Sequence, residues 1–205
     1  MDEENNNVDA EQSASEQTAS EETSTLEAQV VELNVTAKAH LAKGEWEDAV
    51  ACYEQVIAMS ESEGATSMRA EALNNIASVH LALMDWEKAL SYASEARSLY
   101  QAAGDRAGEA VVLNNLAAAQ DGMGGWQEAA SIYEEALELR QAEGDLEGQA
   151  KTLRNLAILY SQHGNRAKAK SYLNRAVALA QQAKSKVLLT EIRQTLSQLP
   201  RMRRR

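Results

Sequence analysis

The chain has 205 residues, a formal net charge of −11, no Phe, one Pro and one Cys. Its abundance of Ala, Leu, Glu and Gln is typical of long helices rather than sheets, so we expect an all-α fold. A single cysteine excludes an internal disulfide framework and fits a reducing compartment. The amino end has no basic region followed by an apolar run, and no stretch is long enough to cross a membrane. We therefore expect a cytoplasmic protein.

Charge is distributed unevenly between the two ends. Residues 1–29 carry nine acidic residues and no Lys or Arg, whereas residues 184–205 carry seven basic residues and one acidic residue. Residues 1–23 have almost no apolar side chains, so burial cannot offset the entropy lost on ordering them. We expect a disordered acidic tail over 1–23 and a basic tail over 200–205.

A period of forty residues organises the rest of the chain. Trp46, Trp86 and Trp126 lie forty residues apart, and Arg166 takes the fourth place. Such a period is typical of an array in which each unit buries its apolar face against the next. We expect four units followed by a capping helix, over about 24–64, 65–104, 105–144, 145–183 and 184–199.

Each unit predicts a pair of helices. In the first helix, helix A, a Leu column is followed four residues later by an Ala column, which marks one packed face (Leu33, Leu73, Leu113, Leu153; Ala37, Ala77, Ala117, Ala157). In the second helix, helix B, the apolar stripe starts at a second Ala column (Ala49, Ala89, Ala129, Ala169).

Turn signals separate these helices. Gly44, Gly124 and Gly164 end helix A, with Met84 in the same column, and Gly64, Gly104 and Gly144 end helix B, with Lys184 in the fourth place. Asp105 and Asp145 follow as expected N-caps.

The columns resemble the tetratricopeptide repeat. Gly44-Glu45-Trp46-Glu47-Asp48-Ala49 with Tyr53, and Gly124-Gly125-Trp126-Gln127-Glu128-Ala129 with Tyr133, are similar to its signature of Gly-x-aromatic followed by Ala and an aromatic residue. The usual unit is about 34 residues long and ends in Pro, whereas this unit is longer and has Glu or Gln there. The longer unit is similar to repeats of the kinesin light chain and spindle-orientation adaptors.

This resemblance implies both a fold and a function. The implied fold is a right-handed superhelical solenoid of four antiparallel helix pairs plus a C-terminal capping helix. The implied function is that of a non-catalytic adaptor or scaffold, which binds an extended segment of another protein in its concave groove.

Polar residues between the Leu and Ala columns are the candidate peptide ligands. They are Asn34 in the first unit, Asn74 and Asn75 in the second, Asn114 and Asn115 in the third, and Arg154 and Asn155 in the fourth. Asn is a poor helix-interior residue, so its recurrence needs a reason. In one hypothesis the amides bind the main chain of an extended partner. In the alternative, they hydrogen-bond between adjacent repeats.

Further candidates belong to the same groove or to other chemistries. Lys38, Lys151 and Arg154 are candidate groove ligands, and the last two lie one turn apart, where they could hold a carboxylate or form an ordinary solvated face. His40 and His80 share a column, but two histidines are too few for a metal site, so we expect no metal and no cofactor. We find no catalytic motif, and Cys52 lacks a nearby base or cation.

A second hypothesis of function rests on the carboxyl end. Arg201, Arg203, Arg204 and Arg205 could contact an acidic partner in a regulatory or nucleic-acid-associated assembly factor. Nucleic-acid binding is disfavoured by the net acidic body and by the absence of aromatic residues in this tail. Large Trp side chains near the helix junctions also make the formation of homo-oligomers an open alternative.

Overall fold

The computed structural model describes residues 25–62 and 64–199. Within these ranges the chain forms helices joined by short turns and contains no strand. The chain divides into two compact units, the first ending at Met68 and the second beginning at Arg69. The two expected tails, over 1–23 and 200–205, lie outside the described residues.

The first unit contains a helix over 25–43 and α2 (Trp46–Ser62). Ala37 and Ala49, from the two predicted Ala columns, are fully buried here. Glu32 and Thr36 are exposed, although their equivalents in the third repeat, Val112 and Leu116, are buried. The first repeat therefore has a polar edge where the third repeat has an apolar one.

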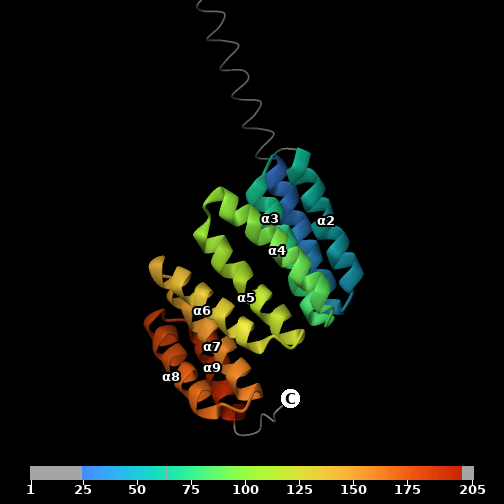
Figure 1. Cartoon of the computed structure of the whole chain (residues 1–205). Helices are drawn as coiled ribbons and strands as arrows, with labels where there is room; N and C mark the ends of the chain where they lie inside the picture. Colours follow the sequence, from blue (N-terminus) through green and yellow to red (C-terminus); the bar gives the residue numbers. More distant parts are fainter. Residues whose placement is uncertain (1–24, 63, 200–205) are drawn as a thin grey trace, which may run out of the picture. The chain divides into compact units, whose positions relative to one another are not determined.

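The second unit begins within α3 (Thr66–Ala82) and continues as an array of helices. The remaining helices are α4 (Trp86–Ala103), α5 (Arg106–Gly122), α6 (Trp126–Ala142), α7 (Leu146–Gln162), α8 (Arg166–Gln182) and α9 (Lys186–Gln198). From α4 onward each helix packs against the next, and α7 also contacts both α5 and α9. Figure 1 shows these helices following one another in chain order. The array is therefore an all-α solenoid in which one helix A lies beside the next.

The predicted packing columns form the core of this array. Ala77, Ala117 and Ala157 are fully buried, as are Leu113 and Leu153. On the helix-B side, the second Ala column is equally buried (Ala89, Ala129, Ala169). Small residues at these positions let neighbouring helices approach closely, and the surrounding Leu side chains fill the remaining space.

The predicted turns are also observed. Every Gly at a predicted helix end has a positive φ, between +67° and +93° (Gly44, Gly64, Gly104, Gly124, Gly144, Gly164). Met84 and Lys184, the two residues that replace Gly in these columns, have φ values of 59° and 56°. Asp105 and Asp145 cap α5 and α7 by accepting hydrogen bonds from the backbone N–H groups of Gly108 and Gly148, each at 2.8 Å. The N-cap prediction is therefore confirmed.

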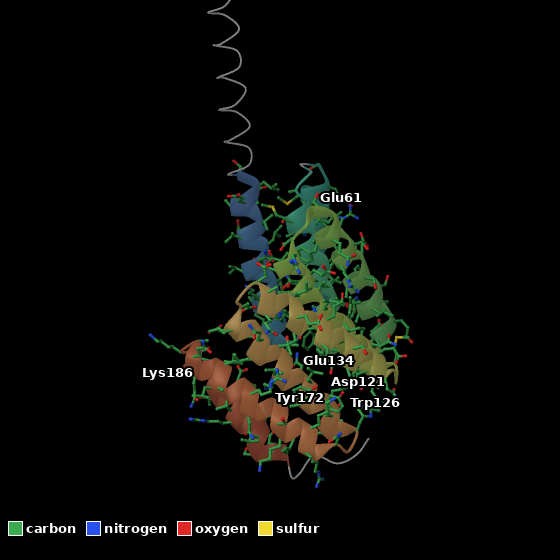
Figure 2. The ribbon with its side chains drawn as sticks, turned by 60° about the vertical axis from the view of Figure 1, so that its left-hand side comes forward. Glu61, Asp121, Trp126, Glu134, Tyr172 and Lys186 are labelled. Carbon is green, nitrogen blue, oxygen red and sulfur yellow. The ribbon has the colours of Figure 1, made fainter. Side chains whose placement is uncertain are left out.

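Aromatic side chains join the two helices of the fourth repeat and link them to the third repeat. The Tyr160 ring stacks on Tyr172 with 5.6 Å between ring centroids, and the Lys168 ammonium lies 4.0 Å from the centroid of Tyr160. Tyr172 of α8 also donates to Glu134 of α6 at 3.4 Å, and Figure 2 labels this pair. The hydrogen bond from Lys168 to the Tyr160 hydroxyl is the main reason why the pKa of Lys168 is raised.

A buried arginine links α6 to its neighbours. Arg140 is 8% exposed; its Nη1 lies 2.9 Å from the Asp145 carboxylate, and its Nη2 donates to the Ala110 carbonyl at 3.2 Å. Tyr100 holds the equivalent place one repeat earlier. Gly148 and Gly108 give room to these two side chains, because a Cβ at either position would collide with Arg140 or with the Tyr100 ring.

The last helix of the described residues, α9, occupies the place of a helix A. Ile192 and Leu199 are buried on its inner face. In the columns that inner repeats fill with buried Leu153 and Ala157, α9 has Arg193 and Ser197, which are exposed. In α9 the face that packs against helix B in the inner repeats is therefore polar, and the expected capping role of this helix stays a prediction.

Candidate functional site

The predicted groove residues lie in the middle of each helix A, on the side that packing leaves accessible. Asn75 lies on α3, Asn115 on α5 and Asn155 on α7, and all three are half-buried. Asn74, the residue before the first of them, is 7% exposed. Burial of an amide requires hydrogen-bond partners, so the contacts of these side chains decide what they can do.

Adjacent repeats are joined through this set of residues. The Asn115 amide donates to the Asn74 Oδ1 at 2.8 Å and to the Ser78 Oγ at 2.9 Å. One repeat later, the Asn155 amide donates to the Asn114 Oδ1 at 3.4 Å. These inter-repeat bonds correspond to the alternative that the sequence left open. They use the amide nitrogen of Asn115 and one N–H group of Asn155, and peptide binding by these side chains stays a prediction.

The same spacing recurs at the capping helix. Arg154 Nε donates to the Thr195 Oγ1 at 2.9 Å, across 41 residues, and the two Asn pairs are also 41 residues apart. Thr195 occupies in α9 the place that Asn155 occupies in α7. The guanidinium of Arg154 is therefore held partly by the cap, while Lys151, one turn away on α7, is exposed.

The first unit presents a different surface at the equivalent positions. Asn34 is half-buried, and Lys38 is exposed one turn further along the helix. Val35, in the column of Asn75, Asn115 and Asn155, is 63% exposed, and Val31 is 62% exposed. Val35 thus replaces an amide in its column, and Val31 is a second exposed apolar side chain one turn before it.

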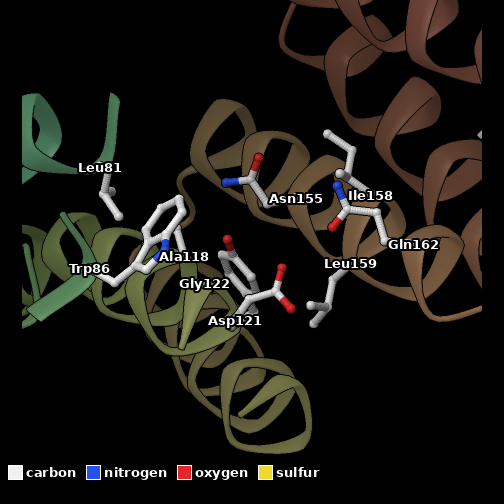
Figure 3. Close-up of a pocket in the computed structure, with 10 residues that line it drawn as sticks. Leu81, Trp86, Ala118, Asp121, Gly122, Asn155, Ile158, Leu159 and Gln162 are labelled. Atoms are coloured by element: carbon white, nitrogen blue, oxygen red, sulfur yellow. The ribbon is translucent and has the colours of Figure 1, made fainter. Parts of the chain in front are cut away.

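A pocket of about 240 Å³ lies next to Asn155 in the second unit. Its apolar lining comes from the carboxyl ends of α3, α5 and α7 and from the start of α4 (Leu81, Trp86, Ala118, Gly122, Ile158, Leu159). Its polar lining consists of Asp121, Tyr133, Asn155 and Gln162. Figure 3 shows Trp86 at one side of the pocket and Ile158, Leu159 and Gln162 at the other.

Glycine at position 122 shapes this pocket. The Trp86 indole lies against Gly122 so closely that a Cβ there would overlap the ring. The same column has Ala42 and Ala82 in the first two repeats and Gln162 in the fourth. Gly122 therefore allows Trp86 to lie against the end of α5, where it forms a wall of the pocket.

Asp121 is the carboxylate of the pocket. Its Oδ1 lies 3.0 Å from the His163 Nε2, and the His163 ring stacks on Trp126 with 4.9 Å between centroids. Figure 2 labels Asp121 and Trp126 near each other in this region. Burial raises the pKa of the Tyr133 hydroxyl, and the Asp121 charge raises it further. Tyr133 is therefore neutral near physiological pH, and Asp121 brings the negative charge.

The sequence-based prediction did not include Trp86, Asp121, Ile158 or Gln162. Ile158 and Gln162 continue the helix-A face that begins at Asn155, at intervals of three and four residues. Asp121 shares its column with Leu41, Leu81 and Ser161, so it is the acidic exception in that column. These residues could have been predicted from the helix-A face that continues beyond Asn155 toward the carboxyl end, and from the acidic residue that interrupts the column of Asp121.

Metal binding and a reactive cysteine have little support among the described residues. One group could hold a metal ion: His40, Glu45 and Asp48 offer ligand atoms within 4.8 Å of one another. His40 Nδ1 lies 2.7 Å from Glu45 Oε2, and this hydrogen bond is the main reason why the pKa of Glu45 is lowered, so the group is a hydrogen-bonded cluster at a helix turn. Burial raises the pKa of the Cys52 thiol, the opposite of what a reactive thiolate needs.

The basic tail of the second hypothesis lies outside the described residues. Over 25–62 and 64–199, no helix is both long and apolar enough to cross a membrane.

Comparison with protein families identifies the repeats. Models of the tetratricopeptide repeat match residues 35–65, 68–142 and 122–182, which together cover more than half of the chain. The chain belongs to the tetratricopeptide repeat family. The resemblance inferred from its Gly, Trp and Ala columns is therefore confirmed. No curated protein sequence matches the chain.

Solved structures share the tetratricopeptide fold. BtubC (BKLC) from P. vanneervenii is 26% identical, with a TM-score of 0.63 over 76% of this chain and 65% of that one. Kinesin-light-chain-like repeats from Podosopora anserina are 20% identical, with a TM-score of 0.59 over 82% of this chain and 84% of that one. A Rap protein complexed with competence and sporulation factor is 16% identical, with a TM-score of 0.69 over 80% and 48%. This chain thus spans less than two thirds of the lengths of BtubC and the Rap protein.

Proposed function

We propose that this tetratricopeptide chain is a non-catalytic adaptor that binds an extended segment of a partner protein along its helix-A face. The pocket beside Asn155 is the observation that carries the proposal, because it offers one concave, mostly apolar site with several polar groups. The solved complex of a Rap protein with competence and sporulation factor has the same fold, which supports a role in binding another molecule.

Other predicted ligands lie on helices that also line the pocket. Asn75 and Lys151 lie on helices α3 and α7 and are accessible to a partner. The Asn115 and Asn155 carbonyl oxygens remain as acceptors after their amide nitrogens have bound the preceding repeat. An extended backbone could donate to such oxygens, while one of its side chains enters the pocket.

Filling the pocket tests the proposal. Peptides of about twelve residues would be selected from a random library on the full chain, and their affinities measured by calorimetry. Ala118→Arg places a large side chain at the pocket, whereas Ala178→Arg places the same side chain at an exposed position of α8 outside it. We expect Ala118→Arg to weaken binding at least ~tenfold, equivalent to about 1.4 kcal/mol, and Ala178→Arg to have little effect.

Thermal unfolding of both variants would check that the fold is kept. Equal affinities for wild type and Ala118→Arg would show that the selected peptides bind elsewhere, which would contradict the proposal.

A further inference from the structure

The pocket beside Asn155 has a negative electrostatic character. Its lining contains one carboxylate, Asp121, and no Lys, Arg or His among the described residues. The Asp121 side chain is only 16% exposed, so water screens its charge less than it would on an open surface. The Asp121 Oδ1 contacts His163. The other carboxylate oxygen, Oδ2, has no hydrogen-bond partner in the described part of the chain.

Three helix ends add to this character. Leu81 lies in the last turn of α3, Asp121 in the last turn of α5, and Gln162 is the last residue of α7. The carboxyl end of a helix carries partial negative charge and favours a cation. The opposing amino end of α4, which supplies Trp86, is capped by the Asp85 carboxylate. The helix termini around the pocket therefore favour positive charge.

The size and chemistry of the lining suit one long side chain. A volume of about 240 Å³ is below the roughly 300 Å³ at which pockets for drug-sized ligands begin. Ala118, Ile158 and Leu159 offer an apolar path for a methylene stem. Trp86 adds an aromatic surface to the lining, and Asp121 and Asn155 add oxygen acceptors.

We propose that this pocket binds the arginine side chain of an extended partner segment. A guanidinium is planar, stacks on aromatic rings and donates to carboxylate and amide oxygens in a fixed fork, which a lysine ammonium cannot reproduce. The inference rests on the proposed function and specifies the partner: its bound segment carries an arginine at the position that meets Trp86 and Asp121.

Four synthetic peptides test this inference with the full chain. Acetyl-Ala-Ala-Xaa-Ala-Ala-amide would carry arginine, citrulline, leucine or glutamate at Xaa, where citrulline has nearly the shape of arginine without its charge. Binding is followed by the NMR signal of the Trp86 indole N–H, assigned with Trp86→Phe. We expect saturable shifts with the arginine peptide and about tenfold weaker binding of the citrulline peptide, because a hydrogen bond between two charged groups is stronger than one to a neutral group.

Three variants separate charge from structure. Asp121→Asn keeps the shape and a contact with His163, and we expect it to weaken binding of the arginine peptide about tenfold. Gln162→Lys leaves Asp121 in place but adds a positive charge to the lining, and should weaken binding as well. Glu138→Gln removes one exposed charge from α6 outside the pocket and should leave the affinity unchanged.

The outcomes distinguish this inference from the proposed function. Stronger Trp86 shifts with the leucine or glutamate peptide would overturn the arginine assignment and still support peptide binding. Equal affinities of wild type and both pocket variants would also overturn it. If no peptide moves the signal while library peptides remain sensitive to Ala118→Arg, only the arginine assignment fails. A signal that moves without peptide when Arg201, Arg203, Arg204 and Arg205 are changed to Gln would identify the chain's own end as occupant, against a partner.

Discussion

The side-chain amide of Asn115 donates to the Oδ1 of Asn74, one repeat earlier, at 2.8 Å. It also donates to the Ser78 hydroxyl and the Asn74 carbonyl, so a single amide nitrogen joins α5 to α3. In a linear array, stability comes from the repeats themselves and from the interfaces between neighbours. A polar residue in the middle of helix A therefore contributes to the interface, whatever it does for a partner.

Removing this amide should weaken the array. We expect Asn115→Ala to lower the free energy of unfolding by about 1 kcal/mol, because the lost hydrogen bonds outweigh the better helix propensity of Ala. Asn75→Ala is the matched control, since the Asn75 side chain forms no hydrogen bond with described residues of the second unit. Its stability should stay level or rise by about 0.5 kcal/mol. If urea denaturation showed that Asn115→Ala and Asn75→Ala lower the free energy of unfolding equally, a specific role for Asn115 would be contradicted.

Two N-caps differ in one contact and allow the buried arginine to be tested. Asp105 and Asp145 each cap a helix through a 2.8 Å hydrogen bond, but Asp145 also pairs with buried Arg140 at 2.9 Å. We expect Asp105→Ala to cost about 1 kcal/mol. Asp145→Ala should cost about 1 kcal/mol more, less than a fully buried pair would, because the Asp145 side chain is 44% exposed.

A double variant identifies the origin of that difference. Arg140→Met replaces the buried cation with an apolar side chain of similar length, so adding it should remove most of the extra cost of Asp145→Ala. Chemical denaturation of wild type, Asp145→Ala, Arg140→Met and the double variant would measure the coupling energy between Arg140 and Asp145. A coupling close to zero would mean that the Arg140–Asp145 contact adds nothing to stability.

Two turns carry residues that are poorly suited to their backbone conformation. Met84 and Lys184 have φ values of 59° and 56°, where other repeats have Gly. Met84 is 70% exposed, so Met84→Gly loses little packing and should raise the free energy of unfolding by about 1 kcal/mol. Gly104→Ala, at φ 68°, should lower it by a similar amount. Melting temperatures that move in the same direction for both variants would contradict this account.

The fold followed from the sequence because its main determinants are local or periodic. Ala77, Ala117 and Ala157 recur at one spacing, and only a small residue suits a close helix contact, so their burial could be predicted. The turns at the Gly columns and the Asp N-caps could be predicted equally well, since a positive φ and an exposed helix amino end restrict the choice of residue.

The side-chain contacts of the site were harder to predict from the sequence, because a column of residues defines a helix face but not the atom that each side chain contacts. Whether Asn115 meets a peptide or Asn74 depends on how α5 and α3 sit side by side, which the period alone does not determine. Arg140 shares its column with Ser60, Tyr100 and Ala180, so nothing in the pattern indicated a buried cation. The pocket needs the ends of four helices together, and its acidic member, Asp121, breaks the repeat rather than following it.

Tyr100 predicts how the array responds to alkali. Burial raises the pKa of its hydroxyl to about 12, and the nearby Glu71 and Asp105 charges act in the same direction. An unfolded chain has a tyrosine pKa of about 10. Between these values the unfolded chain has lost the proton and the folded chain has kept it. The contribution of Tyr100 to stability is therefore complete below pH ~10 and lost as pH rises toward ~12, by at most about 1.4 kcal/mol per pH unit.

Tyr100→Phe isolates this contribution, because phenylalanine keeps the ring that lies against Gly108 and has no proton to lose. We expect the variant to lose less stability than wild type between pH 10 and pH ~11.5 in urea denaturation. Absorbance at ~295 nm should show one fewer late-titrating tyrosine in the folded variant. Tyr133 and Tyr172, whose pKa values are also raised, remain in both proteins, so the comparison reports on Tyr100 alone. If wild type and variant lose stability in parallel, the Tyr100 hydroxyl ionises in the folded chain as readily as in the unfolded one.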